Sequence, residues 1–350
     1  MAYKKATLYY MSGTGNTFRA ANWMAEEAGR LGVSAEVAGI GEGVPRAENP
    51  SAEHLTGLMM PTHGFTAPWR MIWFALRLTR GKGAHAFVAA CRGSLKIGRV
   101  QVPGLEGTAC YLIALILALK GYRVRGVAAF DMPANWLQVH PGLSPATARY
   151  MASRARPKAE RFIRDIISGE RRFGAVTLAC LFLGLLLFPA SLGYLFFARF
   201  FLPKIFFADN RCNGCGLCAR ECPFRAIRMW GVKRPRPYWT FRCESCMKCM
   251  AHCPTEAIQA GHSWGAILLY VSCLLPAIYA LSVLLSPVLS AHAGSAWVSA
   301  IIHYLYFLVA VAIAYPVFAL LVRIPFINAL FAYTTFTRIY RRYRGPDESA

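Results

Sequence analysis

The chain has 350 residues, of which 56% are hydrophobic and only 16% are charged, and its mean hydropathy is +0.36. This length exceeds one typical domain, and the apolar balance excludes a chain built only from ordinary soluble domains. The formal net charge is +22, yet we find no zinc finger, RNP-type motif or basic recognition helix. The basic surface therefore favours an anionic membrane face and acidic protein partners over nucleic acid.

The N-terminus carries no secretory signal, because the apolar run after Lys4 and Lys5 is broken at once by the sequence SGTGNT. We therefore expect it to stay in the cytoplasm, where thiols are kept reduced. Eight of the twelve cysteines lie between Cys212 and Cys253 and are predicted metal ligands. Four single cysteines are predicted to be small buried hydrophobic residues: Cys91, Cys110, Cys180 and Cys273.

Residues 1–172 alternate between short apolar segments and segments with helical periodicity. Strands are predicted at 4–11, 35–40, 55–61, 84–93 and 122–131, and helices at 17–32, 68–81, 108–121 and 144–169. This alternation predicts an α/β domain, a doubly wound parallel sheet with helices on both faces. In such folds the ligand lies beyond the carboxyl ends of the strands, so the loop after the first strand is the default site.

That loop has the sequence SGTGNT, from Ser12 to Thr17. Its glycines let backbone N–H groups surround an anion, its hydroxyls add donors, and the next helix contributes its positive end. The loop lacks the lysine of a Walker A motif, and Phe18 stands where a dinucleotide loop has its third glycine. Hydroxyls without a cation suit one terminal phosphate monoester. The alternative is a tight turn that binds nothing.

The motif Ser/Thr-x-Thr-Gly-x-Thr resembles the phosphate loop of flavodoxins, which binds the phosphate of FMN. The resemblance implies a flavodoxin-like sheet with strand order 2-1-3-4-5, and it implies flavin-ring contacts from the loops after the third and fourth strands. His63, Phe65 and Trp69 are candidates for stacking on the ring. The FMN-binding residues implied are Ser12, Gly13, Thr14, Gly15, Asn16, Thr17, Thr62, His63, Gly64, Phe65, Cys91, Arg92 and Gly93.

Residues 173–208 form an apolar stretch that is interrupted at FPASLG and contains Arg199 and Lys204. We interpret it as two short helices that meet at Pro189 and dip into or lie along the inner membrane face. A single crossing is the alternative, and it would place the next domain outside the cell.

Residues 209–260 contain the spacing Cys-x2-Cys-x2-Cys-x3-Cys-Pro twice. In this arrangement three cysteines bind one cubane and the fourth binds the other. Cluster one would take Cys212, Cys215, Cys218 and Cys253, and cluster two would take Cys243, Cys246, Cys249 and Cys222. The repeat resembles the bacterial two-[4Fe-4S] ferredoxins, which implies a small α+β domain. Four-thiolate zinc is the alternative.

Residues 263–323 are predicted to form two transmembrane helices, from Trp264 to about Ser286 and from Trp297 to about Val322. The loop between them has no Lys or Arg, whereas Arg323 and a basic tail, 324–350, follow the second span. The positive-inside rule then places both flanks in the cytoplasm. His303 lies in the last span, and we predict that it makes a helix-packing hydrogen bond. The alternative is a ligand of a b-type haem, which would need a facing histidine, and the other span has none. A further alternative is a quinone-binding pocket between the two spans.

The order of domains resembles the fused flavodoxin/ferredoxin proteins over residues 5–260. The resemblance implies an electron carrier with FMN and two [4Fe-4S] clusters. The apolar segments, which the soluble members of that family lack, predict that the chain is anchored in the inner membrane as a multi-pass protein with redox domains facing the cytoplasm. Its partners would be a membrane reductase, a lipid-modifying enzyme or quinone. A redox sensor and a flavin-free scaffold subunit are the alternatives, and no catalytic residue is predicted.

Overall fold

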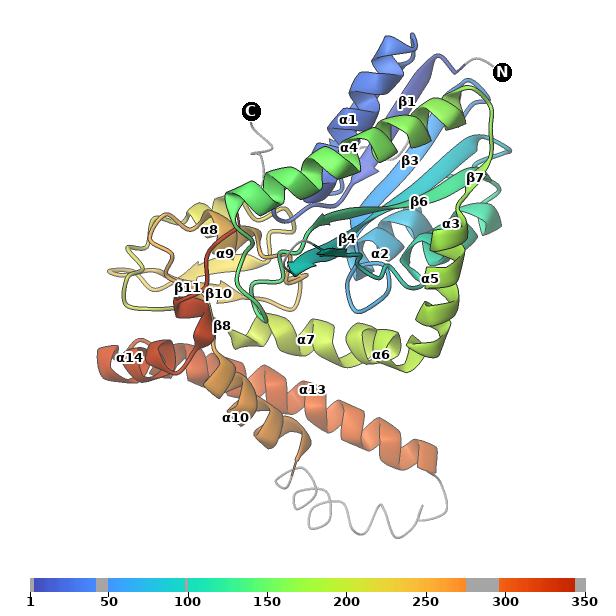
Figure 1. The fold of residues 1–350 in the computed structure, drawn as a ribbon. Coiled ribbons are helices and arrows are strands. Elements are labelled where there is room, and N and C mark those ends of the chain that lie inside the picture. Colours follow the sequence, from blue (N-terminus) through green and yellow to red (C-terminus); the bar gives the residue numbers. More distant parts are fainter. Residues whose placement is uncertain (1–2, 42–49, 98–99, 275–295, 344–350) are drawn as a thin grey trace. The chain divides into compact units, whose positions relative to one another are not determined.

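A computed structural model describes residues 3–41, 50–97, 100–274 and 296–343 of the chain (Figure 1). The contacts divide the chain into two units. The first contains Met1–Phe197, Cys246–Ala251 and Arg341–Ala350, and the second contains Ala198–Ser245 and His252–Tyr340. Each unit is described by itself.

The first unit is built on one mainly parallel sheet. Its strands are β1 (Lys5–Tyr10), β2 (Ser34–Gly39), β3 (His54–Pro61), β4 (His85–Ile97), β5 (Val100–Val102), β6 (Arg123–Pro133) and β7 (Arg172–Phe173). The order is β2-β1-β3-β4-β6-β7, with β5 antiparallel to β4. The five longer strands follow the predicted order 2-1-3-4-5, and the short β5 and β7 are additions that no sequence signal indicated.

Four helices cover this sheet: α1 (Asn16–Arg30), α2 (Trp69–Arg77), α3 (Ala109–Leu119) and α4 (Pro145–Ile167). Helices α1 and α4 lie on one face, and α2 and α3 lie on the other (Figure 1). The Ser144 side chain caps α4 by accepting a hydrogen bond from the Thr147 backbone N–H at 3.2 Å. The helices therefore bury both faces of the sheet, as parallel strands require.

The core between the sheet and the helices α1 and α4 is aromatic and aliphatic. Phe87 on β4 packs edge-to-face against Phe162 on α4, with ring centroids 5.7 Å apart. A Cβ atom at Gly57 on the neighbouring strand would lie 2.3 Å from the Phe87 ring. Glycine at this position therefore makes room for the ring, and the packed core holds the carboxyl ends of β1, β3 and β4 in register.

The apolar stretch after β7 forms α5 (Ala175–Leu186), α6 (Phe188–Gly193), a π-helical turn η1 (Tyr194–Ala198), α7 (Arg199–Phe201) and the turn η2 (Leu202–Ile205). The axis bends by 73° between α5 and the segment Phe188–Ile205. This bend agrees with the predicted pair of short helices meeting near Pro189. As far as Phe197, the stretch packs with the first unit.

The dicluster region of the second unit contains only short elements. Strands β8 (Phe206–Ala208) and β11 (Ile258–Ala260) pair antiparallel, as do β9 (Ile227–Trp230) and β10 (Arg236–Trp239). The helices are α8 (Leu217–Arg220) and α9 (Lys248–His252). These elements are those of a small α+β domain.

The second unit ends in helices α10 (His262–Cys273), α13 (Ala296–Leu321) and α14 (Pro325–Tyr333) and the turn η3 (Phe336–Arg338). Helices α10 and α13 lie side by side (Figure 1). Trp264 of α10 stacks on Phe318 of α13, with ring centroids 4.0 Å apart. Within the described residues, one helix is long and apolar enough to cross a membrane, at Ala300–Leu321, and the bent pair gives a second if it is one span. The predicted span from Trp264 begins as α10, and its later part lies outside the described residues.

Candidate functional site

The loop from Ser12 to Thr17 lies at the carboxyl end of β1 and leads into α1. Gly15 is the N-cap residue and has φ 89°, a left-handed conformation that glycine adopts without strain. A glycine cap offers no side-chain oxygen to the N–H groups of the first turn. A bound anion is the partner that such a helix start favours.

A backbone carbonyl at the end of β6 and a side chain just after it hold this loop in place. The Asn16 Nδ2 group donates to the Pro133 carbonyl at 2.8 Å, and Asn135 donates to the Thr14 hydroxyl. The Cys91 thiol is buried, which raises its pKa to about 12 despite a hydrogen bond with Thr17. Cys91 is therefore a neutral thiol at the loop, as expected of a single buried cysteine, and it is no nucleophile.

The residues present fit a phosphorylated flavin in one further respect. The Thr62 hydroxyl, at the end of β3, is buried and has no hydrogen-bond partner within the described part of the chain. Its backbone N–H donates to the Cys91 carbonyl at 3.2 Å, which fixes Thr62 beside the middle of β4. A buried hydroxyl without a partner is costly, so a ligand oxygen or nitrogen is its natural partner.

The loop after β3 has a protein partner that the sequence did not reveal. His63 Nδ1 lies 3.0 Å from the Tyr194 hydroxyl of η1, and a Cβ atom at Gly64 would lie 2.4 Å from the Tyr194 side chain. Burial lowers the pKa of His63 to about 4, so its ring is neutral at physiological pH. Phe65 is partly exposed with φ 60°, and Trp69 stacks on Trp73. Flavin contacts by His63, Gly64, Phe65 and Trp69 stay predictions.

Cys91, Arg92 and Gly93, which were predicted at the start of a loop after the fourth strand, lie inside β4 because this strand continues to Ile97, and Arg92 is part of an ion-pair network. The Arg92 guanidinium, 5% exposed, donates to Glu106 at 2.7 Å and to Asp131 at 2.8 Å. It also donates to the Cys180 sulfur of α5 at 3.3 Å. The predicted flavin contact of Arg92 therefore competes with three protein partners, all of which the sequence reading missed because they are far apart in the chain. Gly93 follows in the same strand.

The second unit brings together the predicted ligands of cluster one. Burial, and then the neighbouring thiols of Cys212, Cys253 and Cys215, raise the pKa of Cys218 to about 12. The fourth cysteine of the second repeat thus lies within electrostatic range of the first three of the first repeat. Crossed ligation requires this nearness, and the ligand set of cluster one stays a prediction.

The two repeats also share unusual backbone conformations. In the first repeat Gly214, Gly216 and Arg225 have positive φ values of 75°, 73° and 45°. The equivalent positions of the second repeat, Ser245, Met247 and Glu256, have φ values of 49°, 65° and 50°. Left-handed conformations are strained for Ser, Met and Glu, and their recurrence indicates that the fold around each cluster demands them.

The predicted ligands of cluster two are Cys243, Cys246, Cys249 and Cys222, and they are divided between the two units, so this ligand set stays a prediction. Among the described residues, no three His, Cys, Asp or Glu side chains form a site for one metal ion. A cubane is larger than a single ion, and its four thiolates stand farther apart than those of one zinc.

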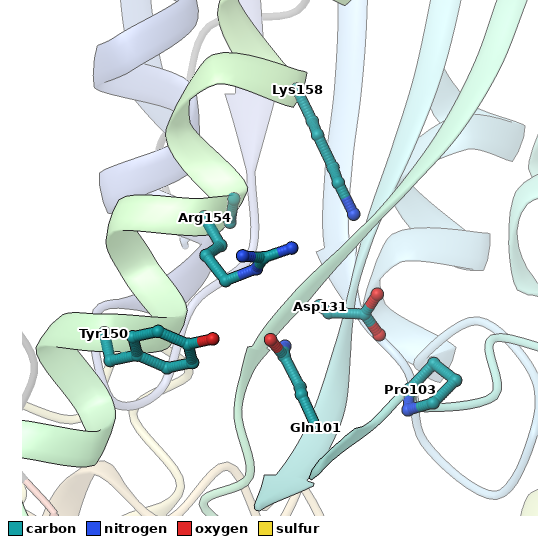
Figure 2. A pocket seen from close by; sticks show the side chains of 7 residues that line it. Gln101, Pro103, Asp131, Tyr150, Arg154 and Lys158 are labelled. Atoms are coloured by element: carbon teal, nitrogen blue, oxygen red, sulfur yellow. The ribbon is translucent and has the colours of Figure 1, made fainter. Parts of the chain in front are cut away.

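A separate hollow of about 420 Å³ lies between α4 and the strands β5 and β6. Arg154 and Lys158 extend from α4 toward the strand side, where Gln101 and Asp131 lie (Figure 2). None of the predicted FMN-binding or cluster-binding residues lines it. The acidic residue that lines this hollow, Asp131, is already paired with Arg92 at 2.8 Å. We therefore assign no function to the hollow.

The family model described as a 4Fe-4S dicluster domain matches residues 211–257, which contain all eight clustered cysteines. The region is therefore a dicluster domain with sites for two [4Fe-4S] clusters. A search of curated proteins found no match for the chain.

Solved structures resemble the first part of the chain at low identity. A flavodoxin from the domain Archaea is 16% identical, with a TM-score of 0.31, covering 46% of this chain and 99% of that protein. Oxidised flavodoxin 1 from Bacillus cereus is 16% identical, with a TM-score of 0.34, covering 47% and 98%. Rubredoxin oxygen:oxidoreductase from Desulfovibrio gigas is 12% identical, with a TM-score of 0.30, covering 47% of this chain and 37% of that chain.

The strand order β2-β1-β3-β4-β6 is itself the flavodoxin-like order. Together with the dicluster domain, it gives the chain the architecture of a fused flavodoxin/ferredoxin protein. Domains of these two kinds serve electron transfer.

Proposed function

We propose that this chain is a membrane-anchored electron-transfer protein that passes electrons between FMN and two [4Fe-4S] clusters. The observation that carries the proposal is the joining, in one chain, of a phosphate loop at the carboxyl end of β1 and a dicluster domain at residues 211–257. A flavin exchanges two electrons and a cubane exchanges one, so their combination divides or assembles a two-electron couple.

The first unit would hold FMN by its phosphate. The N–H groups at the start of α1 and the hydroxyl of Ser12 would bind the anion, and Thr62 would donate to or accept from the ligand. Asn16, Asn135 and Cys91 would keep the loop in shape. When bound, the flavin would supply the redox chemistry. The protein would hold the flavin in place, and the His63 ring beside the site would be uncharged.

Membrane anchoring is supported by the way the dicluster region is built onto α13. The Tyr315 hydroxyl donates to the Phe206 carbonyl at 3.2 Å and accepts from the Trp239 backbone N–H at 3.2 Å. Tyr315 is buried and lies two turns before Arg323, the first basic residue after α13. In this proposal the clusters lie at the basic end of the span, and that end faces the cytoplasm.

A second support for anchoring is the exposed face of α5. Thr177, Cys180 and Gly184 are buried against the first unit, which places them on one helical face. Large apolar side chains on the other faces are exposed: Val176, Leu178, Phe182, Leu183, Leu185 and Leu186. In the proposal this surface rests in the lipid of the inner membrane, and the bent pair dips into one leaflet.

The partners we propose are an acidic electron donor and a membrane reductase or quinone, because the chain is basic and would lie at a membrane. The chain would act as an inner-membrane, multi-pass component of an electron-transfer chain, with its redox domains in the cytoplasm, rather than as a stand-alone enzyme.

The test is an anaerobic purification of the full chain in detergent, with FMN, iron and sulfide quantified. We expect about one FMN and about eight iron atoms for each chain, and electron passage from dithionite-reduced clusters to the flavin by optical and EPR spectra. Iron without flavin would instead support the scaffold, and slow exchange with state-dependent partner binding would support the sensor. Cysteine labelling that places residues 212–253 outside the cell would contradict the topology.

A further inference from the structure

The last described residues of the chain reach the phosphate loop of the first unit. The Tyr343 hydroxyl donates to Asn16 Oδ1 at 2.6 Å, and the two residues are 327 positions apart in the chain. The other end of the Asn16 amide, Nδ2, donates to the Pro133 carbonyl at 2.8 Å. A donor on Oδ1 and an acceptor on Nδ2 together fix the orientation of the amide.

Tyr343 is buried in the first unit, with only 4% of the residue exposed. The Gly142 N–H donates to the Arg341 carbonyl at 2.8 Å. A Cβ atom at Gly142 would lie 2.6 Å from the Arg341 oxygen and 2.9 Å from the Tyr343 nitrogen. Only glycine at position 142 leaves room for Arg341 and Tyr343 to pack this closely. Two separate parts of the first unit, around Asn16 and around Gly142, therefore hold Tyr343 in place.

The hydroxyl of Tyr343 remains a donor throughout the physiological range. Burial raises its pKa, although Arg19 opposes the shift. Asn16 is itself buried and is the first residue of α1. If the tyrosine hydroxyl were absent, the Asn16 carbonyl oxygen would lose a buried hydrogen bond, and the side chain would be free to turn toward the loop.

We propose that Tyr343 is a positioning residue of the FMN phosphate site: by holding Asn16 it keeps the start of α1 open for the phosphate. The inference rests on the proposed function, because it assigns a role at the site where FMN would bind. Both polar ends of the Asn16 side chain are bound to protein, so Asn16 acts through the shape of the loop and leaves the anion to backbone N–H groups and hydroxyls. The affinity for FMN should therefore depend on the shape of the loop, whereas the affinity for riboflavin, which lacks the phosphate, should not.

The experiment measures binding of FMN and of riboflavin to flavin-depleted full chain in detergent, followed by quenching of flavin fluorescence. Tyr343→Phe removes only the hydroxyl. We expect its Kd for FMN to rise about tenfold and its Kd for riboflavin to change by less than about twofold, as loss of one buried hydrogen bond predicts. Tyr333→Phe, at a tyrosine that is 74% exposed, is the matched control and should leave both constants unchanged.

Gly142→Ala provides a second route, since its Cβ atom displaces Arg341–Tyr343 without touching the tyrosine hydroxyl. It should raise the Kd for FMN as Tyr343→Phe does. The iron content should stay at the wild-type level, which would show that the chain is folded. The inference is overturned if wild-type chain binds FMN and Tyr343→Phe binds it as tightly, or if FMN and riboflavin weaken equally. Failure of the wild-type chain to bind FMN defeats the proposed function, and the inference with it.

Discussion

In the flavodoxin-like sheet, the phosphate loop joins a buried strand of 6 residues to a helix of 15 residues, whereas the dicluster cysteines lie between strands of 3 or 4 residues and helices of 4 or 5 residues. The first site is held by a parallel sheet packed on both faces. The second has little backbone hydrogen bonding of its own, so its order depends on the metal. One region should therefore survive loss of its cofactor, and the other should not.

The largest expected effect is the loss of a cluster. Cys218→Ser removes a ligand of cluster one, and we expect iron to fall from about eight to about four atoms or fewer for each chain, because the remaining thiolates cannot complete a cubane. FMN content should stay within about a tenth of the wild-type value. Iron, sulfide and flavin assays on the same preparation measure this contrast.

Cys273→Ala is the control for this substitution, because Cys273 lies in α10, outside the cluster motif, and should leave both contents unchanged. Cys273 is exposed, so the prediction that it is a buried hydrophobic residue was wrong. A Cys218→Ser protein that kept all its iron would refute the ligand assignment. One that lost its flavin as completely as its iron would refute the independence of the two regions.

The next effect concerns the ion-pair network in the first unit. Arg92→Met leaves the buried Glu106 carboxylate and Asp131 without their cation, which should lower the free energy of unfolding by about 3–5 kcal/mol. Arg156→Met removes two ion pairs, with Glu26 and Glu160, but the arginine is 42% exposed and the change should cost only about 1 kcal/mol. Thermal release of flavin fluorescence measures both, and equal shifts in the two variants would count against a structural role for the buried network.

A smaller effect is expected at the phosphate loop. Ser12→Ala removes a hydroxyl donor to a charged phosphate, a loss of roughly 1.5–3 kcal/mol, so the Kd for FMN should rise about 10- to 100-fold. Ser34→Ala, at an exposed position at the start of β2, is the control. Fluorescence titration measures both, and an unchanged Kd in Ser12→Ala would mean that the phosphate lies elsewhere.

The smallest effect is a pH dependence of the first unit. The unfolded His63 side chain takes a proton near pH 6.5, and the folded one only near pH 4. Between these values the unfolded state binds more protons, so acid destabilises the fold there and has no such effect above about pH 7. The change across the window is at most about 3 kcal/mol, and it is smaller here because the His63 side chain is partly exposed. Thermal unfolding of wild type and His63→Gln in detergent should diverge only below pH 6.5. Parallel curves down to pH 4 would contradict the burial of a neutral ring.

The alternation of strands and helices, and the place of the loop Ser12–Thr17 after the first strand, could be predicted because their signals are local: apolar strands followed by glycine-rich turns. The strand order was predicted only through the resemblance to flavodoxins. The nearness of Cys253 to Cys218 agrees with a spacing that one cubane imposes, and ligation of the cluster by these thiols stays a prediction. The contacts of His63 with Tyr194, and of Arg92 with Glu106 and Cys180, were not predicted. Each joins residues whose sequence neighbours give no hint of the partner, and only the folded sheet brings them together.

The antiparallel pair of β8 and β11 has a consequence for how this chain is assembled. Ala208 is paired with Ile258, and Phe206 with Ala260, so the dicluster segment leaves and rejoins the rest of the chain at adjacent backbone positions. The segment between them is a cassette whose two ends already meet, in the manner of inserted domains. Closure of Ala208 onto Ile258 by a short turn should therefore keep the path of the chain around the deletion. The same deletion would remove Trp239, whose backbone N–H donates to Tyr315, and so would leave part of α13 uncovered.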